Sequence, residues 1–273
     1  MRFVTSSIAT IPADNPCGSE VFSQIVIQGD IAIVWADLNS VIERNDWNII
    51  DLSDEENRRA EGYVREEDRQ RFVQRRRILR HLLGEIFCRE PRDIVLRTDV
   101  NGKPFVDPVS VPWPVSFSLS HSRDRVVFAF VRNRQIGIDI EYRDPLIEVM
   151  KMADVFCTHA ELERLRGLPS QEQLRAFYDC WCAKEAFIKA VGVHDPKSFE
   201  ISFYPQSPRL LRIDNPPADL MQWSFQRFDM GVDWAAMLAV EGRLGPIKVY
   251  QNPLAELASS YCKSLFALLR DPI

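Results

Sequence analysis

One pattern near the middle of the chain constrains the fold more than any other feature. In the run Gly-Ile-Asp-Ile-Glu, residues 137–141, aliphatic and acidic residues alternate. Successive side chains of a strand point to opposite faces, so Asp139 and Glu141 share one face while Ile138 and Ile140 share the other. The pattern predicts a strand that buries its aliphatic face in a core and presents two carboxylates on the opposite face.

A long helix is predicted from about Gln171 to Ala190, because apolar residues recur there at helical spacing and Gly192 stands where a C-cap glycine is expected. Glu185 and Lys189 lie four residues apart, on one face of this helix. If that face meets the acidic face of the strand, three carboxylates converge and their repulsion requires a cation. Ligands that offer only oxygen favour a hard cation, most naturally Mg²⁺ held together with phosphates.

Each half of this pattern has a simpler explanation when it is taken alone. An isolated Asp-x-Glu on a strand is usually a solvated face. Glu185 with Lys189 alone would be a surface ion pair worth a few tenths of a kcal/mol, about 0.2–0.5. The cation site is favoured because the acids occur together on a strand that must bury its other face.

Three further elements are expected in the first third of the chain. The apolar run from Ile25 to Asp37, broken by a Gly-Asp pair, predicts two strands joined by a tight turn. Ser53 and Glu56 have the spacing of a capping box, which predicts a short helix ending near Tyr63. A longer helix is predicted from about Glu66 to Phe87, with one apolar side and one strongly basic side.

Solvent is expected to surround most of the basic side of that helix, where acids of the first turn balance the charge. The basic residues are Arg69, Arg71, Arg75, Arg76, Arg77 and Arg80. Short apolar runs predict strands at 94–96, 117–121, 126–131, 199–203, 222–228 and 234–240. Asn101-Gly102 predicts a tight turn, the segment 204–217 with four prolines a loop, and the amphipathic segment 254–269 a docked helix.

Composition and charge exclude several classes of protein. The 273 residues are 46% hydrophobic and 27% charged, which fits a globular chain with a sizeable core. The net charge of −5 argues against general nucleic-acid binding. No apolar run approaches the ~20 residues needed to span a membrane, and the first residues lack an apolar signal core. The six cysteines show no CxxC spacing, so reduced thiols and a cytoplasmic location are expected.

The GIDIE strand at residues 137–141 and the segment WCAKEAFIK at residues 181–189 of the predicted helix together resemble the paired signature of the 4′-phosphopantetheinyl transferases. The run FSLSHS at residues 117–122, the spacing of the motifs and the chain length resemble the longer surfactin-type (Sfp-type) branch of that family. The resemblance is strong from Leu52 to Gly192 and looser over the remainder.

The resemblance implies an α+β fold of two similar halves, packed face to face as a pseudo-twofold monomer. Each half is expected to hold a mostly antiparallel sheet and one long helix. The boundary is expected near Asn133. Residues 1–133 would then form the N-terminal half with the basic helices, and residues 134–273 the C-terminal half with the metal strand.

The resemblance also implies an enzyme that transfers the 4′-phosphopantetheine arm of coenzyme A to a serine of an apo carrier protein, releasing adenosine 3′,5′-bisphosphate. Such a step depends mostly on positioning and charge neutralisation. The expected ligands of Mg²⁺ are Asp139, Glu141 and Glu185, and the expected catalytic residues are Glu185, Lys189 and Asp139. Whether Glu185 acts as base, as ligand or as both stays open, because a bound cation weakens a carboxylate as a base.

Basic and hydroxyl side chains are expected around coenzyme A by the same resemblance. The Gly-Lys-Pro turn and the Ser-His pair are the family features that contact the cofactor, and Arg71 also matches a basic position. The family more often has Asn where this chain has Ser118. The expected coenzyme A ligands are Arg59, Arg80, Lys103, Pro104, Ser120, His121, Lys184 and Lys189.

Two other functions would require a different sequence. A non-catalytic coenzyme A-binding or carrier-binding protein of the same fold predicts that an acid or Lys189 is missing, and all four residues are present. A different Mg²⁺-dependent phosphoryl or nucleotidyl transferase would need a glycine-rich phosphate loop such as GxxxxGK[ST], which the sequence lacks. The expected partners are an acyl, peptidyl or polyketide carrier protein and coenzyme A, with no nucleic acid and no membrane.

Overall fold

The computed structural model describes residues 9–11, 18–39, 52–100, 102–204, 207–214 and 222–251 of the chain. The predicted helix at 254–269 and Asn101 of the predicted turn lie outside these residues. No helix in the described ranges is both long and apolar enough to cross a membrane.

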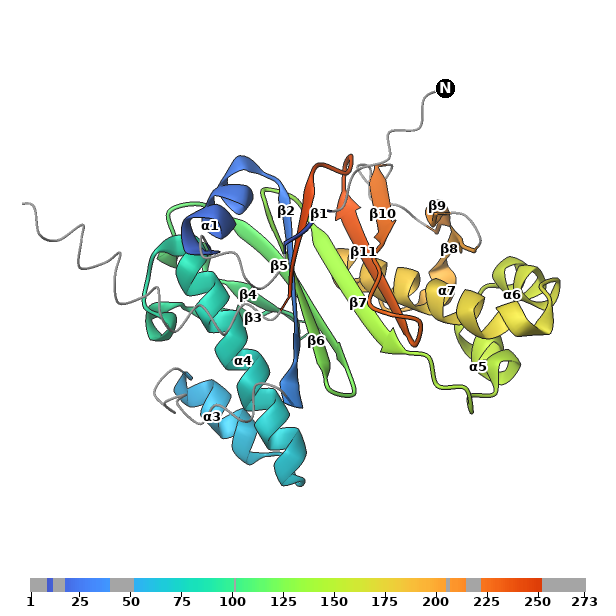
Figure 1. Ribbon diagram of the computed structural model, residues 1–273, viewed down its shortest axis with the longest axis horizontal. Helices are drawn as coiled ribbons and strands as arrows, with labels where there is room; N and C mark the ends of the chain where they lie inside the picture. Colours follow the sequence, from blue (N-terminus) through green and yellow to red (C-terminus); the bar gives the residue numbers. More distant parts are fainter. Residues whose placement is uncertain are drawn as a thin grey trace, which may run out of the picture.

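Two sheets lie side by side in the centre of the molecule, as Figure 1 shows. The larger sheet has the order β1-β12-β2-β6-β5 and the smaller one the order β10-β11-β7. The strands of the larger sheet are β1 Ala9–Ile11, β2 Ile31–Asp37, β5 Val115–Ser122, β6 Arg125–Arg132 and β12 Ile247–Gln251. The smaller sheet contains β7 Ile136–Tyr142, β10 Trp223–Arg227 and β11 Trp234–Glu241. Two hairpins complete the strands: β3 Leu96–Thr98 with β4 Pro104–Val106, and β8 Phe199–Ser202 with β9 Arg209–Ile213.

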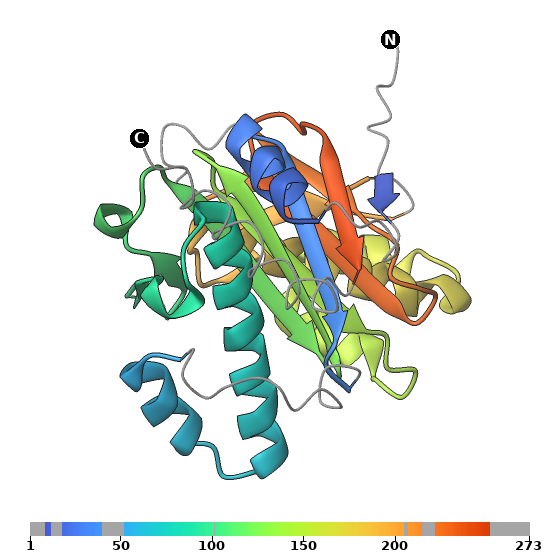
Figure 2. The ribbon, with the colours of Figure 1, turned by 60° about the vertical axis from the view of Figure 1, so that its left-hand side comes forward.

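Helices cover the outer faces of the two sheets (Figures 1 and 2). On the side of the larger sheet lie α1 Gly18–Gln28, α3 Asp54–Glu61 and α4 Glu66–Phe87. On the side of the smaller sheet lie α5 Val149–Phe156, α6 His159–Arg166 and α7 Ser170–Val191. Short 3-10 turns occur at Pro91–Asp93, Pro108–Ser110 and Pro196–Ser198.

Three hydrophobic clusters hold these layers together. The first joins α1 and α4 to the larger sheet, and the second joins α7 to the smaller sheet. The third lies between the sheets, where Ile136, Ile138 and Ile140 of β7 pack with Ile33 and Val127 of the larger sheet. The alternation in GIDIE is therefore confirmed, because the isoleucines of β7 enter the core between the sheets and the acids face α7.

Several local predictions are confirmed. Ser53 accepts a hydrogen bond from Glu56 N while the Glu56 side chain accepts one from Ser53 N, which closes the capping box of α3. The long basic helix spans Glu66–Phe87, as predicted. Gly192 caps α7 in the left-handed region with φ of 81°.

Two local predictions are wrong or incomplete, and one strand was missed. The run before Gly29 is the helix α1 and not a strand, because Phe22, Ile25 and Val26 form its apolar side against the larger sheet. The predicted loop at 204–217 contains β9, which pairs with β8. The strand β12 was not predicted, and it pairs in parallel with both β2 and β1.

The coarse fold class is confirmed as a mixed α+β chain. Six of the eight ladders between described strands are antiparallel, and the two that involve β12 are parallel. Because β12 follows β11 in the chain yet pairs with β2, the two sheets do not divide strictly at Asn133. The division into two halves stays a prediction.

Candidate active site

Gly137 allows the acidic face of β7 to approach α7 closely. A Cβ atom at this position would lie 1.8 Å from Ala186 O and 2.8 Å from Ala190 N, both in the backbone of α7. Only glycine fits a contact of this kind. The first residue of the GIDIE pattern therefore fixes the distance at which Glu185 and Lys189 face the strand acids.

Asp139 is the most buried of the three acids, with 1% of its surface exposed. Its Oδ1 accepts hydrogen bonds from Lys189 Nζ at 2.6 Å and from Ser120 Oγ at 2.7 Å. Lys189 Nζ also donates to Ser120 Oγ at 2.8 Å, so the three groups form a triangle. The other oxygen, Oδ2, is buried without a hydrogen-bond partner. Cys182 lies beside Asp139: burial, followed by the charge of Asp139, raises the pKa of its thiol, which also contacts Ala235 O at 3.6 Å.

Glu141 and Glu185 are partly buried, and each has a raised pKa. Burial raises the pKa of Glu141 to about 7, with a further contribution from Asp139, while the hydrogen bond from Ser122 Oγ (2.8 Å) opposes the shift. Burial also raises the pKa of Glu185, again helped by Asp139 and opposed by Lys189. The charge of Asp139 therefore disfavours ionisation of both glutamates, so the acids share one electrostatic environment.

The residues of this cluster fit a hard cation. Asp139 Oδ2 is a buried carboxylate oxygen without a partner, and a polar atom in that position normally has one. The donor set is oxygen from carboxylates, which suits Mg²⁺. Within the described ranges the three acids do not come within 4.8 Å of one another, as a closed set of ligands would. In the structure without a cation, the ammonium group of Lys189 is the positive charge that contacts the Asp139 carboxylate.

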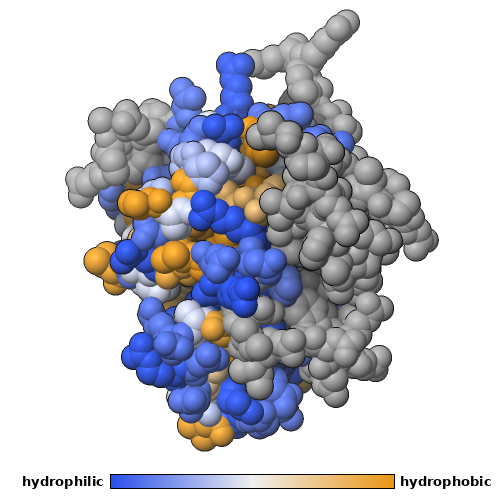
Figure 3. Space-filling view, turned by 90° about the vertical axis from the view of Figure 1, so that its left-hand side faces the viewer, coloured by the Kyte–Doolittle hydropathy of each residue, from blue (hydrophilic) through white to orange (hydrophobic). Residues whose placement is uncertain are grey.

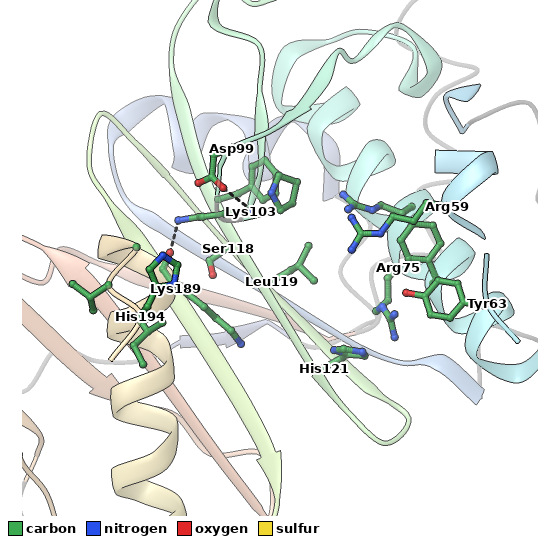
Figure 4. A pocket seen from close by; sticks show the side chains of 18 residues that line it. Arg59, Tyr63, Arg75, Asp99, Lys103, Ser118, Leu119, His121, Lys189 and His194 are labelled. Carbon is green, nitrogen blue, oxygen red and sulfur yellow. Dashed lines mark hydrogen bonds between the residues drawn. The ribbon is translucent and has the colours of Figure 1, made fainter. Parts of the chain in front are cut away.

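A pocket of about 420 Å³ opens next to these acids, between α4, the β3–β4 hairpin, β5 and the end of α7. Figure 4 shows Arg59, Tyr63 and Arg75 on one side of it, Lys189 and His194 on the other, and His121 between them. The lining also includes Phe72, Arg76, Lys103, Pro104 and Ser118. Residues on both sides of Asn133 thus build one pocket.

The pocket is strongly cationic. Burial lowers the pKa of Arg75 to about 10 and also lowers that of Arg76. The guanidinium groups of Arg59 and Arg76 stack over the Phe72 ring, at 5.6 and 5.4 Å from its centroid. Several cations close together with few acids between them favour an anionic ligand.

The outer face formed by α3 and α4 is mostly hydrophilic, with scattered hydrophobic residues (Figure 3).

His121 is neutral at physiological pH. The side chain lines the pocket and is exposed to solvent. Desolvation within the pocket, together with the charges of Arg75, Lys189 and Arg71, lowers the pKa of His121 to about 4. A phosphate group would offset those cations and make the protonated form of His121 more favourable.

Lys103 joins the pocket to α7 from the β3–β4 hairpin. Its Nζ donates to Lys189 O at 2.5 Å and is 3.5 Å from Ile136 O, while Asp99 Oδ1 accepts a bond from Lys103 N at 2.8 Å. Burial lowers the pKa of the Lys103 ammonium, and Asp99 opposes that shift. Pro104 lines the pocket beside it.

Two of the predicted coenzyme A ligands lie away from the pocket. Arg80 is 2% exposed and donates to Glu56 Oε2 (2.7 Å), Pro91 O and Ile94 O, so it ties α4 to the capping box of α3. Ser120 lies on the face of β5 opposite His121 and bonds Asp139. Both predictions are corrected. Neighbouring residues of a strand point to opposite faces, so Ser120 does not face the pocket with His121. The guanidinium of Arg80 makes its hydrogen bonds to structural acceptors.

Lys184 is also corrected, from a phosphate ligand to a buried structural cation. Its side chain is 0% exposed. Lys184 Nζ donates to both carboxylate oxygens of Glu161, at 2.8 and 2.7 Å, and to Phe199 O at 2.9 Å. Glu161 also accepts from Thr158 N and Ile201 N, so the pair connects α6, α7 and β8.

We expect Lys184→Met to lower the free energy of unfolding by about 3–5 kcal/mol, because it leaves the Glu161 carboxylate buried without its counter-charge. Chemical denaturation measured by circular dichroism checks this value. Lys151→Met is the matched control: Lys151 pairs with Glu148 on the surface, and its loss is worth less than about 1 kcal/mol. Equal losses in the two variants would contradict the structural role of Lys184.

The pocket residues that were not predicted as ligands include Tyr63, Arg75, Arg76 and His194. Arg75 and Arg76 were assigned to the solvated side of the long helix. Their position relative to Phe72 gives the one usable signal, since residues three or four apart share a helix face. His194 lies beyond the C-cap of α7, and no sequence pattern marks it.

A second cluster of donor atoms is not a metal site. Cys157, Glu161 and Cys180 have donor atoms within 4.8 Å of one another. The Glu161 oxygens already accept four hydrogen bonds, two of them from Lys184. Burial raises the pKa of the Cys180 thiol, so it remains protonated and binds metal poorly.

Comparisons with known proteins match most of the chain. The family model for the 4′-phosphopantetheinyl transferase superfamily matches residues 135–239, and the model for the N-terminal part of 4′-phosphopantetheinyl transferases matches residues 43–132. The 4′-phosphopantetheinyl transferase HetI of Nostoc sp. is 33% identical over 193 residues, which cover 70% of this chain and 79% of HetI.

Two further relatives align over shorter parts. The putative 4′-phosphopantetheinyl transferase slr0495 of Synechocystis sp. is 34% identical over 52% of this chain and 57% of its own length. The 4′-phosphopantetheinyl transferase Sfp of Bacillus subtilis is 33% identical over 52% of this chain and 66% of its own length. A solved holo-[acyl-carrier-protein] synthase from Thermotoga maritima aligns with 18% identity and a TM-score of 0.33, over 40% of this chain and 63% of that one, which is too low to support an argument.

Proposed function

Because the chain belongs to the 4′-phosphopantetheinyl transferase superfamily, we propose that the cationic pocket binds coenzyme A and that the adjacent acids serve the transfer of its 4′-phosphopantetheine arm to a serine of an apo carrier protein. One observation carries the proposal. Lys189 lines the cationic pocket and bonds Asp139 at 2.6 Å, so the anion-binding pocket and the acidic cluster share a wall. A pyrophosphate in the pocket would lie beside the acids.

Coenzyme A is an anion with a flat base, and the pocket offers complementary groups for both features. Arg59, Arg75 and Lys103 face the 3′-phosphate and the pyrophosphate as cations. The rings of Tyr63 and Phe72, with centroids 5.4 Å apart, form an apolar wall suited to an adenine ring. His121, as a neutral imidazole, offers a hydrogen bond to the bound anion.

Asp139 and Glu141 hold Mg²⁺ in this proposal, with Glu185 beside them. The ion supplies positive charge that stabilises the negative charge developing on the pyrophosphate oxygens. Lys189 neutralises a phosphate oxygen as a point charge. Asp139 Oδ1 is bonded to Lys189 in the structure, so the same ammonium would stand between this carboxylate and a phosphate bound in the pocket that it lines.

Glu185 accepts the proton of the carrier serine, directly or through a water molecule. Its raised pKa in the protein without cation favours this role, and a cation bound directly to the carboxylate would oppose it. The serine oxygen forms a bond to the phosphorus that carries the pantetheine arm. The bond from that phosphorus to the bridging oxygen breaks, and adenosine 3′,5′-bisphosphate leaves with the electron pair.

One copy of the chain supplies the whole pocket, which supports a monomer with two related halves. Lys103 and His121 come from the N-terminal half, and Lys189 and His194 from the C-terminal half. Four described cysteines are free thiols, which suits a reducing compartment such as the cytoplasm. The proposed carriers are acyl, peptidyl or polyketide carrier proteins.

Product analysis tests this function. The protein is incubated with coenzyme A, Mg²⁺ and an apo carrier, and nucleotides are separated by chromatography. We expect adenosine 3′,5′-bisphosphate and holo-carrier to appear in equal amounts, and neither to appear with a carrier whose acceptor serine is replaced by alanine. Binding of coenzyme A without product on carriers from several pathways would favour a non-catalytic binding module of the same fold.

The affinity for Mg²⁺ should rise with pH between about 6 and 8. The pKa of Glu141 is raised to about 7, so the protein without cation holds a proton there below that pH. Mg²⁺ needs the ionised carboxylate, and its binding therefore releases a proton in this window. Calorimetric titrations in two buffers of different ionisation enthalpy measure the release. The pH dependence should be weaker in Glu141→Gln, where Glu185 is the remaining acid with a raised pKa, and an unchanged dependence in that variant would contradict the assignment.

A further inference from the structure

The edge strands of the two sheets meet without a backbone ladder. In the described chain β5 pairs with β6 and β7 with β11, and no strand pairing joins β5 to β7. The residues of β5 alternate between two faces. Phe117 and Leu119 pack in the cluster below α4, whereas Ser118, Ser120 and Ser122 point toward β7.

Serine hydroxyl groups supply hydrogen bonds across this seam. Ser118 Oγ accepts from Ile138 N at 3.1 Å, and Ser122 Oγ accepts from Tyr142 N at 3.1 Å. Ser120 Oγ donates to Asp139 Oδ1 at 2.7 Å. Ser122 Oγ donates to Glu141 Oε2 at 2.8 Å. Two of the three serines thus bond one carboxylate each.

We propose that Ser120 and Ser122 are positioning residues, whose hydroxyl groups fix the orientation of Asp139 and Glu141 toward the cation. The inference rests on the proposed function, because it concerns the same cation site. It extends that function to a strand of the other sheet, which carries none of the three acids.

The donors around the serines dictate which way each hydroxyl points. A serine oxygen has one hydrogen to donate and accepts with its lone pairs. Ser122 Oγ already accepts from the backbone of Tyr142, and Ser120 Oγ accepts from the Lys189 ammonium, so each hydrogen is free to bond a carboxylate. The terminal torsion of a carboxylate is otherwise broad. In Asp139 the bonds use Oδ1 and leave the buried Oδ2 available to a cation.

Ser122→Ala tests the inference, with Ser118→Ala as matched control. Both variants remove one hydroxyl from the same face of β5 and leave one backbone N–H of β7 without its acceptor, but only Ser122 bonds a carboxylate. Mn²⁺ serves as the probe, and electron paramagnetic resonance of the free ion measures its binding in the absence of coenzyme A, because Ser118 lines the pocket that is proposed to bind coenzyme A. We expect Ser122→Ala to weaken Mn²⁺ binding about tenfold. Ser122→Thr, which keeps the hydroxyl, and Ser118→Ala should bind Mn²⁺ within about twofold of the wild type.

Denaturant midpoints separate positioning from a general loss of structure. Ser122→Ala and Ser118→Ala should shift the midpoint by similar amounts while differing in Mn²⁺ affinity. Wild-type affinity in Ser122→Ala, or equal weakening in Ser118→Ala, would overturn the inference and leave the proposed function intact. Failure of the wild type to bind Mn²⁺ would overturn both the cation site and the inference. Tight Mn²⁺ binding in a protein that transfers no arm would overturn the reaction alone.

Discussion

Gly137→Ala is expected to lower the rate of phosphopantetheine transfer by at least ~100-fold. The added methyl group would lie 1.8 Å from Ala186 O, a distance that real Cβ contacts essentially never show. The helix α7 must therefore move away from β7 by about 1 Å or more, and displacements of that size at a reacting centre cost ~10²-fold in rate. Overpacking of this kind also lowers the free energy of unfolding by about 1–3 kcal/mol or more.

Transfer rate and thermal midpoint, measured on the same preparation, check this expectation. Gly167→Ala is the control. Gly167 has ordinary helical angles and its nearest neighbours are 3.6 Å from the added methyl group, so the change should be neutral or stabilising by up to ~1 kcal/mol. A Gly137→Ala protein with wild-type activity would show that the spacing of α7 and β7 does not set the site.

The variants Asp139→Asn and Glu185→Gln should each reduce turnover strongly while coenzyme A still binds. Loss of charge at Asp139 removes a cation ligand and the partner of Lys189, and an electrostatic loss of this type is worth ~100-fold or more. Loss of a general base at Glu185 is worth ~10²–10⁴-fold. Steady-state rates and calorimetric coenzyme A affinities measure the two effects separately.

Glu148→Gln is the matched control for these acid variants. Glu148 lies on the surface, paired with Lys151, and its amide form should leave the rate unchanged. Equal turnover in Asp139→Asn and the wild type would remove this acid from the catalytic machinery. If a variant lost both coenzyme A binding and activity, the acid would be needed to bind coenzyme A rather than for the transfer step.

Local patterns sufficed to predict the elements that carry the acids. Alternation along GIDIE placed Asp139 and Glu141 on one face, and the structure confirms that face against α7. The i, i+4 spacing placed Glu185 and Lys189 on one helix face, and Lys189 indeed reaches Asp139. Such patterns are short-range, so a single sequence suffices to identify them.

The predictions that were wrong concern residues whose position depends on contacts between distant segments. Lys184 and Lys189 occur in one motif, yet a helix turns about 100° per residue, and only the tertiary structure shows that Lys184 meets Glu161 in the core. Arg80 is held by Glu56 from the capping box, a pairing across 24 residues. The strand β12 resembles any short apolar run, and its place beside β2 is decided by the sheet.

The strand β5 illustrates both outcomes within six residues. The alternation of FSLSHS predicted a strand, which the structure confirms. The same alternation separates His121, in the pocket, from Ser120 and Ser122, at the acids. Ser120 and His121 therefore cannot both face coenzyme A in the pocket, as the sequence prediction had them.

Intact-mass spectrometry of an apo carrier protein tests the central claim most directly: that the acids of β7 and α7 carry phosphopantetheine transfer from coenzyme A. The carrier is incubated with coenzyme A and the wild type, Asp139→Asn or Glu185→Gln, in Mg²⁺ or in a chelator. The account predicts a gain of one phosphopantetheine arm with the wild type in Mg²⁺, and no gain in the chelator or with either variant at the same time point. A full gain with both variants, or no gain with the wild type on any class of carrier, would contradict it.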